Sequence, residues 1–295
     1  MATKTAMITI AGRPNVGKST LTNYLVGEKI AIVSNKPQTT RNRICGIVTR
    51  GDTQFVFVDT PGYHRARTKL GDYMVNVARE SIADVDATIL VVEPIPSIGP
   101  QEEGLIEKIK GSRCPAILAI NKIDTVEKDK LLEVIALYSQ AAAFDAIIPI
   151  SAKTGDGVDA LLECCGKYAV ESPFLFDEEL TTDQPERQVM AEIIREKLLW
   201  NLDREIPHGT AVEITRFSER DNGIIDLDAT IYCEKASHKG IIIGKRGDML
   251  KKISTQARTD CEKFMGTKVY LTTWVKVKEN WRDSDFLVRN FGYND

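Results

Sequence analysis

The chain has 295 residues, a length that suits two domains of ordinary size, each able to bury its own core. Its 39 Lys and Arg residues against 42 Asp and Glu residues give a net charge of -3, so any nucleic-acid contact must come from a local basic patch. The sequence has no signal peptide and no run near the ~18 apolar residues of a spanning helix, so we expect a cytoplasmic protein without evident peripheral membrane contact. Six cysteines without CxxC spacing argue against a zinc site and against disulfides, and predict reduced thiols: Cys45, Cys114, Cys164, Cys165, Cys233 and Cys261.

From residue 6 to about residue 168, short apolar runs typical of strands alternate with helical patterns. This alternation predicts an α/β domain, residues 1–172, with a mostly parallel sheet. Ligand sites in such sheets lie at the carboxyl ends of the strands, so motifs that directly follow strands are the first candidates for a site. The expected strands are Met7–Ile10, Gln54–Asp59, Thr88–Val92, Ala116–Ile120 and Ile147–Ile150.

A phosphate-binding loop follows the first expected strand and opens a helix, which is the context that the GxxxxGK[ST] motif requires. Backbone N–H groups of its glycine turn converge on phosphate oxygens at the helix N-terminus. Lys18 is expected to reach the β and γ phosphates, and the Ser19 hydroxyl is expected to bind magnesium. The expected nucleotide contacts of this segment are Gly12, Asn15, Val16, Gly17, Lys18, Ser19 and Thr20.

Two further segments are expected around the γ phosphate. Asp59 ends an apolar strand and is expected on the outer shell of magnesium, while the Gly62 N–H meets the γ phosphate. The polar segment 38–43 lies between these motifs, and from it we select Thr40, rather than Thr39, as the γ-phosphate-sensing magnesium ligand. Tyr63 stands where Ras-like proteins carry the glutamine that orients water, so another group positions the water or hydrolysis awaits a partner; we interpret His64 as an exposed switch residue.

The guanine base is predicted to lie against two loops that follow later strands. A carboxylate at Asp124 accepts from the guanine N1 and N2 groups, a donor pair that adenine lacks, so adenine nucleotides should be rejected. The second loop supports the base through its backbone. The expected base contacts are Asn121, Lys122 and Asp124 in the first loop, and Ser151, Ala152 and Lys153 in the second.

An irregular, acidic stretch with Pro173 and Pro185 predicts a linker over residues 173–186. The second domain, residues 187–295, is expected to be a smaller α+β unit with a C-terminal tail. Its expected elements are a helix at 187–203, strands at 210–217 and 224–233, a glycine loop, a helix at 248–265 and a strand at 268–277.

The glycine loop of the second domain has the GxxG form of a KH nucleic-acid clamp, in which glycines let the backbone of a single strand approach closely. Residues 235–278 hold eleven Lys and Arg against three Asp and Glu, which predicts a basic patch in an acidic protein. Without further support, the loop can also be read as a glycine turn on a solvated helix. The expected RNA contacts are Ile242, Ile243, Gly244, Lys245, Arg246, Gly247, Lys251 and Lys252.

The whole pattern resembles the Era GTPases of bacteria and organelles, in which a P-loop GTPase domain is followed by a type II KH domain. The resemblance rests on the phosphate and KH loops and on segments 39–41, 70–74, 205–208 and 273–283. It implies GTP hydrolysis, with Asn15, Lys18, Thr40 and Gly62 as catalytic residues and GTP or GDP with magnesium as cofactors. It also implies a potassium ion held by Asn15, although Asn15 can instead merely brace the loop.

The same resemblance implies that the partners are the small-subunit ribosomal RNA, bound near its 3′ end, and the immature small ribosomal subunit. Two alternatives stay open at this point. One is a GTPase that assists a tRNA-modifying enzyme, and the KH loop discriminates against it. The other is an RNA-binding module with a vestigial nucleotide site, against which the intact Lys18, Ser19, Asp59 and Asp124 speak.

Overall fold

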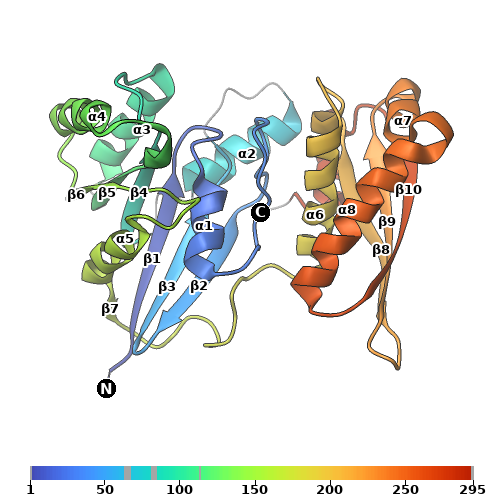
Figure 1. The fold of residues 1–295 in the computed structure, drawn as a ribbon, viewed down its shortest axis with the longest axis horizontal. Coiled ribbons are helices and arrows are strands. Elements are labelled where there is room, and N and C mark those ends of the chain that lie inside the picture. Colours follow the sequence, from blue (N-terminus) through green and yellow to red (C-terminus); the bar gives the residue numbers. More distant parts are fainter. Residues whose placement is uncertain (1, 63–67, 81–84, 113, 294–295) are drawn as a thin grey trace. The chain divides into compact units, whose positions relative to one another are not determined.

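The computed structural model describes residues 2–62, 68–80, 85–112 and 114–293 (Figure 1). The chain divides into two compact units, and each has its own hydrophobic core. The first unit comprises Met1–Ala31, Thr40–Arg65 and Met74–Asp183, and the second comprises Ile32–Thr39, Ala66–Tyr73 and Gln184–Asp295. Two short segments from the first half of the sequence therefore belong to the second unit.

The first unit is built on a seven-stranded sheet whose central order is β2-β3-β1-β4-β5-β6. The strands from β3 to β6 run parallel, whereas β2 runs antiparallel to β3, and β7 pairs antiparallel with the start of β1. The strands are β1 (Lys4–Ala11), β2 (Ile44–Arg50), β3 (Thr53–Asp59), β4 (Ala87–Val92), β5 (Ala116–Ile120), β6 (Ala146–Pro149) and β7 (Val170–Glu171).

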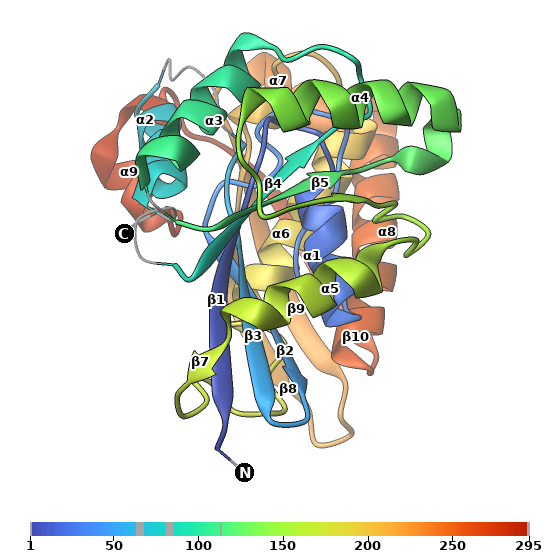
Figure 2. The same ribbon diagram turned by 90° about the vertical axis from the view of Figure 1, so that its left-hand side faces the viewer.

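Helices cover both faces of this sheet, and they explain why β4 and β5 are apolar throughout. Alternate strand residues such as Ile89 and Ile117 pack with α1 and α5, while Leu90 and Leu118 pack with α3 and α4 on the opposite face (Figure 2). The helices are α1 (Lys18–Val26), α3 (Pro100–Ser112), α4 (Lys128–Ala141) and α5 (Val158–Cys165), and α2 (Lys69–Glu80) has residues in both units.

The second unit has a three-stranded sheet of order β10-β9-β8, in which β8 and β9 are antiparallel and β9 and β10 are parallel. Three helices bury their apolar faces against it in a common core. The order helix, strand, strand, helix, helix, strand confirms the predicted type II KH fold. The elements are α6 (Glu186–Asn201), β8 (Ala211–Glu219), β9 (Ile225–Cys233), α7 (Ala236–Ile243), α8 (Asp248–Met265), β10 (Val269–Val277) and α9 (Asp285–Asn290).

The predicted helix at 248–265 has the observed bounds, and the predicted strands fall within a few residues of the observed ones. Helices α7 and α9 of the second unit and strands β2 and β7 of the first were not among the predicted elements. Among the described residues, no helix combines the length and the apolar character needed to cross a bilayer. The predicted limits 1–172, 173–186 and 187–295 remain a proposal for the domain boundaries.

Candidate nucleotide and RNA sites

The phosphate loop connects β1 to α1 and is held in a shape that requires glycine. Gly17 has a positive φ of 103°, and a Cβ on it would lie 2.2 Å from the Asn121 amide nitrogen. Lys18 is only 6% exposed, and its Nζ donates to the carbonyl oxygens of Gly12 at 3.2 Å and Arg13 at 3.1 Å. The ammonium group therefore lies against the carbonyl groups of its own loop, at the N-terminus of α1.

One asparagine joins three of the predicted motifs. The side-chain amide of Asn121 donates to the Val16 carbonyl at 2.8 Å, and its side-chain oxygen accepts from the Ala152 N–H at 2.9 Å. Asn121 follows β5 and is 2% exposed, so these bonds are shielded from water. The sequence assigned Asn121 to the nucleotide but did not reveal that it fastens the loops to one another.

Three oxygen-bearing side chains meet where magnesium was expected. The Ser19 hydroxyl donates to Asp59 Oδ2 at 2.6 Å and lies 2.9 Å from the Thr40 hydroxyl. The other oxygen of Asp59 is buried without a hydrogen-bond partner among the described residues. An unpartnered buried carboxylate oxygen beside two hydroxyls fits a hard divalent cation.

The electrostatics of this cluster suit a site for a cation and phosphates. Burial raises the pKa of Asp59 to about 6, an effect that the nearby Lys18 partly opposes. Burial likewise lowers the pKa of Lys18, and Asp59 opposes that shift. Each group is therefore placed where an ion of opposite charge would favour its charged form.

The two candidate threonines differ in what their hydroxyls do. The Thr39 hydroxyl donates to the Lys36 carbonyl at 2.7 Å, within its own segment, whereas the Thr40 hydroxyl lies at the Ser19 and Asp59 cluster. Gly62 is brought against the phosphate loop, because a Cβ on it would lie 2.8 Å from the Pro14 nitrogen. Tyr63 and His64 lie outside the described residues.

The predicted base site is assembled from the loops after β5 and β6. The buried Ser151 hydroxyl donates to Asp124 Oδ1 at 2.7 Å, and Asp124 itself is exposed, as is Lys153. Lys122 donates to the Asn15 carbonyl at 2.8 Å and to Glu93 at 2.5 Å. Lys122 thus covers the phosphate loop from the base side.

Sequence reasoning missed an ion network beside this loop. Arg13 pairs with Glu93, and its Nε lies 3.0 Å from a carboxylate oxygen of Glu102 on α3. Glu93 follows β4 directly, at the same sheet edge as the other motifs. The position of Glu93 directly after a central parallel strand could have marked it as a candidate for the site. Its pairing with Arg13 could not be predicted without the order of the strands.

The KH loop has the backbone that its glycines allow. Gly244 has φ 75°, and a Cβ on it would lie 2.6 Å from the Met249 Cβ, so the start of α8 approaches the loop closely. Arg246 and Gly247 also have positive φ values, 55° and 86°. The cationic side chains of this region are exposed: Lys245, Arg246, Lys251 and Lys252.

The three consecutive isoleucines before the loop have different exposures. Ile242 is 0% exposed and packs in the core of the second unit, so it has no surface to offer to a base, contrary to the expected contact. Ile243 is partly buried against the same core. Ile241, which the sequence analysis did not select, is 50% exposed. The helical period of α7 turns only one of these side chains outward.

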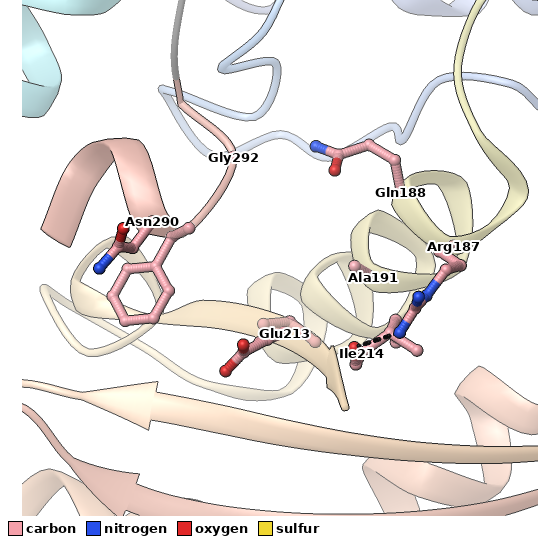
Figure 3. Close-up of a pocket in the computed structure, with 9 residues that line it drawn as sticks. Arg187, Gln188, Ala191, Glu213, Ile214, Asn290 and Gly292 are labelled. Carbon is pink, nitrogen blue, oxygen red and sulfur yellow. Dashed lines mark hydrogen bonds between the residues drawn. The ribbon is translucent and has the colours of Figure 1, made fainter. Parts of the chain in front are cut away.

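The second unit also contains a pocket of about 200 Å³ between α6, β8 and the segment after α9 (Figure 3). Arg187 and Gln188 lie on one side, and Asn290 and Gly292 lie opposite. The Arg187 guanidinium donates to the Ile214 carbonyl at 3.0 Å and thereby connects α6 to β8. No residue of the nucleotide motifs lines this pocket.

Comparison with known sequences finds one family over each of the two candidate sites. Residues 7–122 match the family described as 50S ribosome-binding GTPase, and residues 205–282 match the KH domain. GTPase Era of Ruminiclostridium cellulolyticum is 52% identical over 293 residues, which cover 99% of this chain and 98% of that protein. GTPase Era of Alkaliphilus oremlandii is 51% identical over 295 residues, with both chains covered completely.

Two solved structures resemble the whole chain. One is Era in complex with MgGDPNP and nucleotides 1506–1542 of 16S ribosomal RNA, with a TM-score of 0.95 and 36% identity over 99% of this chain and 100% of that chain. The other is a variant of Aquifex aeolicus Era bound to GDP.AlF4-, with a TM-score of 0.94, 36% identity and the same coverage.

Proposed function

Because the chain belongs to the Era family of GTPases, we propose that it is a GTP-dependent switch that binds single-stranded RNA near the 3′ end of small-subunit ribosomal RNA and assists assembly of the small subunit. The observation that carries this proposal is the presence in one chain of a complete nucleotide site and a KH loop. Full-length similarity to an RNA complex supports the choice of target.

The nucleotide site is suited to GTP with magnesium. Ser19, Thr40 and the unpartnered oxygen of Asp59 would hold the ion, directly or through water, and Lys18 would meet the β and γ phosphates. Magnesium supplies charge neutralisation for the phosphoryl transfer when it is bound. Asp124, oriented by Ser151, would select guanine.

The proposed target is the small-subunit RNA, although one of the two matching families is described as a 50S ribosome-binding GTPase. That match covers only residues 7–122 and contains no part of the KH match at residues 205–282. The RNA complex, in contrast, resembles this chain over both units. The KH match also disfavours a tRNA-modification GTPase, and membership of a GTPase family disfavours a vestigial nucleotide site.

Crosslinking in cells, followed by sequencing of the attached RNA, tests the proposed target. We expect reads to concentrate at the 3′ end of 16S ribosomal RNA and to be lost when Lys245 and Arg246 are both changed to Asp. Enrichment of transfer RNA or of large-subunit RNA in place of the 16S 3′ end would refute the assignment. Hydrolysis of GTP by the same preparation shows that the protein is intact.

The potassium proposal concerns Asn15, an exposed residue of the phosphate loop with φ 67°. A side-chain oxygen beside the phosphates would help hold a monovalent cation that stabilises the charge of the transition state. We therefore expect faster hydrolysis in potassium than in sodium, with the difference lost in Asn15→Ala. Equal rates in both salts for the wild type would leave Asn15 as a brace of the loop.

A further inference from the structure

The segment Ile32–Thr39, which precedes the proposed γ-phosphate sensor Thr40, is part of the second unit and lies against α6. Both backbone groups of Val33 are bonded to this helix. The Val33 N–H donates to Glu196 Oε1 at 2.8 Å, and the Val33 carbonyl accepts from the Trp200 indole N–H at 2.9 Å. The Lys36 ammonium also donates to the Leu202 carbonyl at the end of α6.

The far end of the segment is fixed by a buried arginine. Arg195 is 0% exposed, and its guanidinium donates to the Thr39 carbonyl. Glu192 orients the guanidinium, accepting from Nε at 2.8 Å and from Nη2 at 2.5 Å. Because the Thr39 carbonyl belongs to the peptide group that leads into Thr40, Arg195 acts one bond away from the sensor.

The charges on α6 extend to α8. Lys197 donates to Glu196 Oε2 at 2.7 Å and to Asp260 of α8 at 2.5 Å. Arg195, Glu196 and Lys197 are exposed by 0%, 0% and 1%. Buried ion pairs are a weak source of stability, because desolvation offsets most of their attraction. A helix that only needed to pack would use apolar side chains at these positions.

We propose that α6 is a positioning element for GTP hydrolysis, in which Arg195 and Trp200 hold Ile32–Thr39 in the conformation that presents Thr40 to magnesium. The inference deepens the proposed function and rests on it.

The sharpest variant is Trp200→Phe, which removes the indole donor and keeps a ring. Trp200 is 51% exposed, so the fold should tolerate the change. We expect the GDP affinity to stay unchanged and kcat to fall. The affinity for GDPNP with magnesium should be about fivefold lower, which is the effect expected for the loss of one neutral hydrogen bond. Trp274→Phe is the matched control, because Trp274 is 58% exposed on β10 and its indole nitrogen has no hydrogen bond among the described residues.

Arg195 gives the second pair of variants. Arg195→Met should lower GDPNP affinity relative to GDP by about tenfold or more, on the order expected for a charge-assisted bond, and Arg195→Lys should restore part of the preference. If neither Trp200→Phe nor Arg195→Met changed the ratio of GDPNP to GDP affinity or kcat, the proposal would be overturned. Trp200→Phe keeps the test decisive even if Arg195→Met fails to fold.

Failure of the wild type to bind an RNA of nucleotides 1506–1542, the length seen in the related complex, would refute the proposed target. The ratio of GDPNP to GDP affinity would still test the positioning role of Arg195 and Trp200.

Discussion

At the scale of single residues, the selectivity for guanine that we propose depends on how one carboxylate is held. Asp124 is exposed, so burial does not fix it, and its orientation comes from the Ser151 hydroxyl at 2.7 Å. Ser151 is buried just after β6. Because each carboxylate oxygen has two lone pairs, the group can still accept from both the N1 and N2 groups of guanine, whereas adenine lacks this pair of donors.

Replacing Asp124 by Asn should convert the base preference from guanine toward xanthine. An amide presents a donor where the carboxylate only accepted, and one mismatched polar pair costs about 1–3 kcal/mol, which is about fivefold to 150-fold in affinity. Competition binding with GTP and xanthosine triphosphate measures the change. Asp129→Asn, on the exposed start of α4, is the matched control. Retained GTP affinity without a gain for xanthosine triphosphate would contradict the assignment.

The neighbouring threonines allow a second comparison. Thr40→Ala removes the hydroxyl near Ser19 and should lower kcat by about 10²-fold, since it deletes a group that acts on the triphosphate state. Thr39→Ala removes only the bond to the Lys36 carbonyl and should cost a few-fold at most. Single-turnover hydrolysis and GDP affinity separate the two effects. A larger loss in Thr39→Ala would reverse the roles that we give to these residues.

Residue types and spacing were enough to select candidate side chains that the structure brings together, but not to predict what holds them. The amide of Asn121 bridges residues 16 and 152, and this depends on β1, β5 and β6 ending at the same sheet edge. The contact of Arg195 with Thr39 spans 156 positions of sequence. No local periodicity encodes such a distance, because it arises only when distant elements pack.

At the scale of elements, the C-terminal tail is a structural part of the second unit. Trp281 is 0% exposed, its indole donates to the Gly209 carbonyl at 2.9 Å, and its ring contacts Phe291 edge-on at 5.2 Å. Tyr293 stacks on the same ring at 6.0 Å. The tail therefore closes one end of the unit with an aromatic cluster, and Trp281 has no surface with which to bind RNA.

Trp281→Ala should destabilise the second unit by about 3–5 kcal/mol, the usual cost of removing a large buried aromatic side chain. Urea unfolding followed by circular dichroism measures the change in the free energy of unfolding. Trp274→Ala is the control, since a side chain that is 58% exposed should cost far less. If the two substitutions had equal effects, the aromatic cluster would not stabilise the unit.

Elements were predicted where their periodicity was clean and missed where their composition was ambiguous. Strands β4 and β5 are nearly continuous apolar runs and α8 has a clear amphipathic pattern, so these were predictable, whereas the mixed sequence of β2 and the two residues of β7 gave no such signal. Helix α7 contains Gly240 and three β-branched isoleucines, residues that disfavour helices. It forms because Ile242 is buried in the core, and such tertiary packing overrides local propensity.

At the scale of the whole molecule, basic side chains are concentrated in one segment of a chain whose net charge is negative. The net charge is -3, yet residues 235–278 carry eleven basic against three acidic side chains. An overall negative protein avoids nonspecific binding to nucleic acid, while the local basic patch attracts a phosphate backbone. The exposed Lys245 and Arg246 at the GxxG loop belong to that patch.

Changing both Lys245 and Arg246 to Asp should abolish binding of single-stranded RNA and leave GTP affinity unchanged. Two attractive contacts become repulsive, so affinity should fall by at least about 10²-fold, and the dependence of binding on salt should become shallower because fewer counterions are released. RNA affinity across a salt series, measured beside GTP affinity on the same preparation, tests both statements.

The control for this double variant reverses two exposed lysines on α4, Lys128→Asp with Lys130→Asp, which makes the same change in total charge within the first unit. If the effect came from net charge, both variants would lose RNA affinity equally. If the GxxG loop grips the backbone, only the first variant loses it, because screening confines each charge to about 10 Å at 0.1 M salt. Unchanged RNA affinity in the Lys245 and Arg246 variant would make the loop a simple turn and would move the binding to other basic residues, of which Lys251 and Lys252 at the start of α8 would be tested next.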